Sequence, residues 1–332
     1  MNKRLGYFDC MRGIVMIMVV FCHTNQYSLV NDSFWISNIF SIIMLPGFFF
    51  ISGWFTQFNL RGGVLRRFKT MIIPTTIMFL IYVFLYWGNM EKLLFCASGE
   101  YKWGYWFTFA LFFMNILHCC VSWIFKLINK TSDGIFVGVM ICISVLIILL
   151  KDWDWTHNNA LLAQWISLRQ IAMYFPFYIL GLCCKKWEFL FHRIINNEYV
   201  TAVMMISFIV GLFKQNGGFY FGSIIEVLGV FLLYRLVFFY QDFFSERTKV
   251  GRQLCIIGRN TFPIYLIHYF FFLGLKLPEF DKVIKADSQW VVLAIVVLLT
   301  TLIIIYASLG ITKIFAISKP LSLLFLGSTK VK

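Results

Sequence analysis

Long apolar stretches, separated by short polar segments, follow one another along the whole chain. Ten of them approach or reach the roughly 17–25 residues that a helix needs to cross the hydrocarbon core of a membrane. The pattern therefore predicts about ten transmembrane helices. The predicted spans are residues 13–30, 36–56, 71–88, 105–125, 134–150, 165–184, 199–213, 219–240, 258–275 and 289–317.

The basic residues gather in every second polar segment. With the N-terminus inside, 21 of the 29 Lys and Arg residues fall on the cytoplasmic side, as the positive-inside rule expects. An even number of spans places both termini on that side. We therefore expect an all-α integral membrane protein with both termini cytoplasmic. Residues 1–332 are expected to form a single transmembrane domain with no appended soluble domain.

Composition supports the membrane class. Of the 332 residues, 60% are hydrophobic and only 13% are charged, which is too little polar surface for a soluble fold. The net charge of +14 would suit nucleic acid, but the positive residues lie in short clusters between apolar runs, so no nucleic-acid partner is expected. The nine cysteines form no CxxC, and no spacing of His, Cys, Asp and Glu predicts a metal site.

The first predicted span carries an unusual polar stripe. Arg12 and His23 are eleven residues apart, which is about three helical turns and roughly 16 Å of rise, so both project from nearly the same side, with Asp9 beside them. Burying ionisable groups inside a membrane span costs free energy, so such groups mark functional sites by default. We interpret His23 as a general base and Arg12 as a cationic anchor. The alternative is that His23 only joins two helices while Arg12 reaches the membrane surface.

Three further segments contain candidate residues. A basic cluster follows the second span and contains Arg66, Arg67 and Lys69. Such a cluster either binds phosphates or is an ordinary basic inner loop, and the sequence favours neither interpretation. In the second span, Gly53 and its neighbour Ser52 favour close helix packing over a local opening that admits a ligand.

The ninth span contains a second intramembrane histidine. His268 follows Thr261 by seven residues, so the two share a helix face, with Tyr265 close to it. Asn260 and Thr261 are typical of a helix start, with Pro263 in the first turn. A single histidine of this kind is more often structural than functional, although His268 could face the same cavity as His23.

Taken in order, these segments resemble the membrane-bound acyltransferase-3 family, which includes bacterial O-acetyltransferases that modify cell-surface polysaccharides. The resemblance covers essentially the whole chain. The matching segments are FDCMRGIVMIMVVFCHT (Asp9, Arg12, His23), FFFISGWF (Ser52), RRFKTMIIP (Arg66, Arg67, Lys69), YWFTFALFFMNIL (Trp106), FPFYILGLCCKK and GRNTFPIYLIHY (Thr261, Tyr265, His268). The family usually has Arg-x-Arg in the basic loop, where this chain has Arg66-Arg67-Phe68-Lys69.

The resemblance implies transfer of an acetyl or other acyl group from cytoplasmic acetyl-CoA to a hydroxyl of a cell-surface or lipid-linked saccharide. Arg66, Arg67 and Lys69 would bind the phosphates of the donor, with Arg12 near its entrance. His23, with Arg12 and Asp9, would form the catalytic group, and Ser52, Trp106, Thr261, Tyr265 and His268 would line the substrate cavity. The expected location is the inner membrane of a bacterial cell. Direct transfer, an acyl-enzyme and a homo-oligomer all stay open.

Two other functions compete with the acyltransferase. A transporter or flippase for a lipid-linked glycan would suit many helices and a polar interior, but it predicts an internal repeat that the sequence does not display. A structural scaffold would tolerate replacement of both His23 and Arg12. The acyltransferase is favoured because neither a transporter nor a scaffold requires Arg12 and His23 to lie on the same face of the helix.

Overall fold

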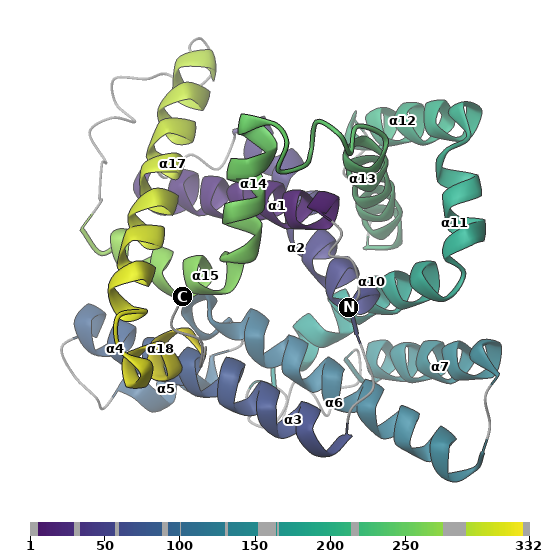
Figure 1. The fold of residues 1–332 in the computed structure, drawn as a ribbon, viewed down its shortest axis with the longest axis horizontal. Coiled ribbons are helices and arrows are strands. Elements are labelled where there is room, and N and C mark those ends of the chain that lie inside the picture. Colours follow the sequence, from purple (N-terminus) through teal and green to yellow (C-terminus); the bar gives the residue numbers. More distant parts are fainter. Residues whose placement is uncertain are drawn as a thin grey trace. The chain divides into compact units, whose positions relative to one another are not determined.

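The structure is a computed structural model, and it describes residues 6–29, 34–56, 60–87, 92–99, 101–129, 132–151, 164, 166–213, 219–274 and 290–327. These residues form helices and turns, with no strand among them (Figure 1). The predicted all-α class is thereby confirmed.

The chain divides into two compact units. The first comprises Met1–Ile51 and Trp187–Gly310, and the second Ser52–Lys186 and Ile311–Lys332, so the boundaries fall within two helices, α2 (Trp35–Trp54) and α17 (Trp290–Phe315). The other elements of the first unit are α1 (Gly6–Thr24), the π-helical turn η1 (Asn25–Leu29), α11 (Glu188–Ile195), α12 (Glu198–Phe213), α13 (Phe219–Phe239), α14 (Lys249–Arg259) and α15 (Thr261–Phe271). Those of the second are α3 (Leu60–Arg67), the π-helical turn η2 (Phe68–Ile72), α4 (Ile73–Trp87), α5 (Leu93–Ser98), η4 (Lys102–Gly104), α6 (Trp106–Leu127), α7 (Asp133–Lys151), α10 (Leu168–Lys186) and α18 (Lys319–Leu326).

Seven helical stretches of the described residues are long and apolar enough to cross a membrane. They are Gly6–Ser28, Trp35–Trp54, Gly63–Trp87, Trp106–Leu127, Asp133–Leu150, Gly222–Phe239 and Trp290–Phe315. Each coincides with a predicted span. The pair α11 and α12, bent by 74°, would add an eighth.

The other two predicted spans form helices of a different kind. The span predicted at 165–184 is α10, which carries three basic residues, Arg169, Lys185 and Lys186. Most of the span predicted at 258–275 is the short helix α15, which begins at Thr261, after Asn260 has left the helical conformation with φ −113° and ψ 20°. The preceding helix, α14, ends at Arg259, so only the first two predicted residues belong to it. The helix start at Thr261 is therefore as predicted. The count of ten and the side of each terminus stay predictions.

Within the first unit, α14 packs directly on α1 (Figure 1). Two glycines permit this approach: a Cβ at Gly13 would overlap the carbonyl of Leu254, and a Cβ at Gly258 would overlap the carbonyl of Asp9. Small residues of this kind let helix backbones touch inside a membrane, where lipid offers no hydrophobic drive for association. The α1–α14 contact is therefore a backbone contact at two points.

The second unit uses the same device. A Cβ at Gly53, near the end of α2, would overlap the carbonyl of Tyr178 on α10. This supports the packing interpretation of Gly53. Gly327, which ends α18 in the left-handed conformation (φ 61°), lies against the carbonyl of Thr70 in η2, so α18 is docked on the π-helical turn by its terminal glycine.

Replacing Gly258 by Ala should destabilise the first unit by about 1–3 kcal/mol, because the added methyl group forces α1 and α14 apart. Thermal unfolding of the purified protein in detergent measures the effect. Gly310→Ala is the matched control, since a Cβ there meets nothing within 4 Å. Equal melting temperatures for the two variants would contradict the tight contact.

Candidate active site

The polar stripe of α1 faces α14 and α15. Asp9, near the start of α1, contacts Arg259 at the end of α14, and His23, near the end of α1, contacts His268 of α15. Between them Met16 and Val20 are almost fully buried. Asp9 and His23 therefore contact the consecutive helices α14 and α15, respectively, whereas the register of Arg12 with His23 stays a prediction.

His23 and His268 form a hydrogen-bonded pair. His23 Nδ1 lies 3.0 Å from His268 Nε2, and the two rings are nearly parallel at 8°, with centroids 5.2 Å apart. His268 is completely buried, and its Nδ1 lies 3.0 Å from the carbonyl oxygen of Ile264, one turn earlier in α15. The hydroxyl of Tyr269 lies 3.3 Å from His23 Nε2. Two imidazoles and a phenol therefore meet where α1 gives way to η1.

The other two residues predicted on α15 lie at different distances from this group. The ring of Tyr265 is buried, and its centroid is 6.3 Å from that of His268. Thr261 is the first residue of α15, almost two turns before His268, and is half-buried. The structure thus places Tyr265 beside the histidine pair, and Thr261 at the opposite end of the helix.

Asp9 is held between two arginines. Its carboxylate accepts from Arg259 Nε at 3.0 Å and from Arg12 Nη1 at 3.5 Å, and the side chain of Asp9 is only 3% exposed. Arg259 also pairs with Glu246. A buried carboxylate needs such partners because desolvation penalises an isolated charge. Asp9 and Arg12 are therefore part of an ion-pair cluster that fastens α1 to the end of α14.

In the second unit, Arg67 is bound inside a polar network. Its Nη1 donates to Asn115 Oδ1 of α6 at 2.6 Å, and the hydroxyl of Tyr178 lies 3.3 Å from the same oxygen. Thr56 Oγ1 is 2.7 Å from that hydroxyl and donates to the carbonyl of Ser52. Ser52 and Arg67 thus belong to one hydrogen-bonded chain.

The two neighbouring cations have a different environment. Arg66 and Lys69 are exposed, whereas Arg67 is half-buried. All three lie at the passage from α3 to η2. Pro74 explains the π-helical turn, because its missing N–H leaves the carbonyl of Thr70 without the usual helical donor.

Trp106, at the start of α6, stacks on Tyr174 of α10 with centroids 5.5 Å apart.

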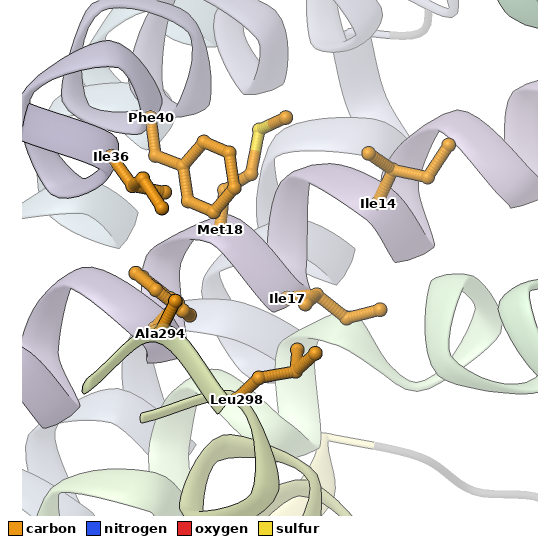
Figure 2. Close-up of a pocket in the computed structure, with 8 residues that line it drawn as sticks. Ile14, Ile17, Met18, Ile36, Phe40, Ala294 and Leu298 are labelled. Carbon is orange, nitrogen blue, oxygen red and sulfur yellow. The ribbon is translucent and has the colours of Figure 1, made fainter. Parts of the chain in front are cut away.

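An apolar pocket lies on the opposite side of α1 from His23. The volume of the pocket is about 280 Å³. Figure 2 shows its lining side chains, which belong to α1, α2 and α17. They are Ile14, Ile17, Met18 and Phe21 of α1, Ile36 and Phe40 of α2, and Ala294 and Leu298 of α17. Ile14 and His23 are nine residues apart, so they point about half a turn away from each other. The pocket and the histidine pair are therefore separate features of the first unit.

The comparison with protein families identifies this architecture. A family model described as an acyltransferase domain matches residues 5–309, nearly the whole chain. The chain belongs to the acyltransferase-3 family. No curated protein and no solved structure gave a match. The protein is accordingly a membrane acyltransferase, and the histidine pair, the Asp9 cluster and the Arg67 network all lie within the matched acyltransferase domain.

Sequence reasoning missed four residues of this acyltransferase. The sequence gives no indication that Arg259 has a distant carboxylate partner, or that Tyr269, next to His268, reaches another helix. Asn115 and Tyr178 were not singled out, although an amide and a phenol inside apolar runs are signals of internal hydrogen bonding. Each of the four acquires its role from a residue far away in the chain, which spacing along one helix does not reveal.

Replacing Asp9 by Asn should lower stability by about 1–3 kcal/mol, because Arg12 and Arg259 lose their shared anion. Unfolding by heat in detergent is the measurement. Asp242→Asn is the control: Asp242 pairs with Arg247 at 3.3 Å, but both side chains are more than four-fifths exposed. Exposed pairs contribute little. An equal effect of the two substitutions would show that the Asp9 ion-pair cluster does not stabilise the fold.

Proposed function

We propose that this acyltransferase transfers an acetyl group from cytoplasmic acetyl-CoA to a hydroxyl of a cell-surface or lipid-linked saccharide. The observation that carries the proposal is the contact between half-buried His23 and fully buried His268, in a span that begins with the Asp9–Arg12 pair. Imidazole is the side chain best suited to take a proton near neutral pH. The expected location is the inner membrane of a bacterial cell.

The proposed reaction is acyl transfer assisted by a general base. His23 takes the proton of the acceptor hydroxyl as its oxygen forms a bond to the thioester carbon. The carbon–sulfur bond then breaks, and the proton passes to the departing thiolate to give free CoA. The phosphates of acetyl-CoA need a separate site, and phosphates prefer ionic hydrogen bonds from Arg and Lys.

The donor phosphates are assigned to the exposed cations. Arg66 and Lys69 have exposed side chains near the start of a span, which suits contact with a soluble anion. Arg67 already donates to Asn115, so we assign it to holding α3 on α6, with any phosphate contact made by its remaining N–H groups. Ser52, Trp106, Thr261 and Tyr265 remain proposed lining residues for the substrates.

His23→Ala should reduce acetyl transfer by about 10²–10⁴-fold, the usual contribution of general-base catalysis. Membranes incubated with radiolabelled acetyl-CoA, followed by counting of label in the glycan, provide the assay. His192→Ala is the control, because His192 is bonded to Tyr234 elsewhere in the first unit. Full activity of a correctly inserted His23 variant would exclude the base. Glycan export without any acetyl label in wild-type membranes would favour a transporter.

Arg66→Ala and Lys69→Ala should each raise the KM for acetyl-CoA by about tenfold, the loss of one charge-assisted hydrogen bond, with a smaller change in kcat. Lys126→Ala removes another exposed cation of the second unit and serves as the control. If all three variants have the same KM as the wild type, the donor phosphates bind elsewhere.

A further inference from the structure

The histidine pair contains one contact that fixes the position of its protons. His268 Nδ1 lies 3.0 Å from the carbonyl oxygen of Ile264. A carbonyl oxygen only accepts hydrogen bonds, so Nδ1 must be the protonated nitrogen of His268. The ring is 0% exposed, and burial favours its neutral form. The other nitrogen of His268, Nε2, therefore presents a lone pair.

That lone pair determines the tautomer of His23. His23 Nδ1 is 3.0 Å from His268 Nε2, and the parallel rings with centroids 5.2 Å apart meet edge to edge, as an N–H···N bond requires. Because Nε2 of His268 accepts, Nδ1 of His23 must donate. In neutral His23 the lone pair is then on Nε2, the nitrogen that faces the hydroxyl of Tyr269 at 3.3 Å.

We propose that His268 is a positioning residue: through the Ile264 carbonyl it holds His23 in the Nδ1–H tautomer, so that Nε2 is the atom that takes the proton of the acceptor hydroxyl. The inference rests on the proposed general-base role of His23. It goes beyond that role because it names the basic nitrogen of His23, the residue that selects this nitrogen, and the backbone carbonyl that orients that residue.

The same hydrogen bonds also stabilise the positive charge that forms on His23 during proton transfer. When His23 Nε2 gains the proton, the ring is an imidazolium whose Nδ1–H already points at His268 Nε2. The hydrogen bond becomes charge-assisted and strengthens as the transition state forms. A second imidazole performs the orienting task that a carboxylate has in serine hydrolases, but without placing a fixed negative charge beside the base.

Nitrogen NMR of ¹⁵N-histidine-labelled protein in lipid bilayers tests the tautomer without any assay of activity. The chain has five histidines, and the His23 signals are assigned by their loss in His23→Ala. We expect a proton on Nδ1 and none on Nε2 in the wild type. In His268→Leu the acceptor is gone, and His23 should shift to the Nε2–H form or a mixture. A wild-type His23 protonated on Nε2 would overturn the proposal.

Activity of two His268 variants provides the second arm. Gln has a side-chain oxygen that can accept from His23 Nδ1, whereas Leu has none, so His268→Gln should stay within about tenfold of wild type and His268→Leu should lose about 10²-fold or more. His192→Leu, which also removes a His–Tyr bond of the first unit, should leave the His23 signals unchanged. Equal losses in the Gln and Leu variants, both correctly folded, would overturn tautomer selection. Absence of acetyl transfer by the wild type would instead overturn the proposed function, while the NMR result still decides the tautomer.

Discussion

The backbone contact between α1 and α14 is the constraint on which the candidate site depends. Gly13 and Gly258 let the two helices touch without intervening side chains. This closeness keeps Asp9 within reach of the end of α14, and α15 begins directly afterwards. Because α15 leaves from that fixed point, His268 arrives at hydrogen-bonding distance from His23. A wider separation would lengthen the contacts at both ends of α1 together.

The two ends of this contact solve the problem of burying polar groups differently. At Asp9 the solution is ionic: one carboxylate is shared by two arginines, each still partly exposed, which limits the cost of desolvation. At His23 the solution is neutral, since one imidazole donates to another and the second donates to a backbone carbonyl. Only the neutral arrangement leaves a group that can change its protonation during a reaction. The ionic end fastens the helices, and the neutral end is the proposed place for chemistry.

Much of this fold was predictable because membrane helices leave strong local signals. Length and hydropathy located the spans from α1 to α17, and the three-turn spacing of Arg12 and His23 predicted a polar stripe with Asp9 beside it. The helix start after Asn260 was predictable, but the short length of α15, which ends at Phe271, was not. Pairing was harder to predict: nothing near Asp9 in the sequence indicates Arg259, and nothing near His23 indicates Tyr269. Such contacts join residues about 250 positions apart and depend on how helices pack.

The basic segment illustrates the limit most clearly. In the sequence Arg66, Arg67 and Lys69 form one cluster with one expected role. The structure separates them, because Asn115 takes the guanidinium of Arg67 into the interior of the second unit while its neighbours stay exposed. Consecutive helical residues point about 100° apart, so adjacent cations need not share a ligand. Lys69 lies in the π-helical turn, whereas Arg66 and Arg67 end α3, so the helical geometry also differs between them. Charge density along a chain therefore predicts that an anion is attracted, and side-chain direction decides which cations meet it.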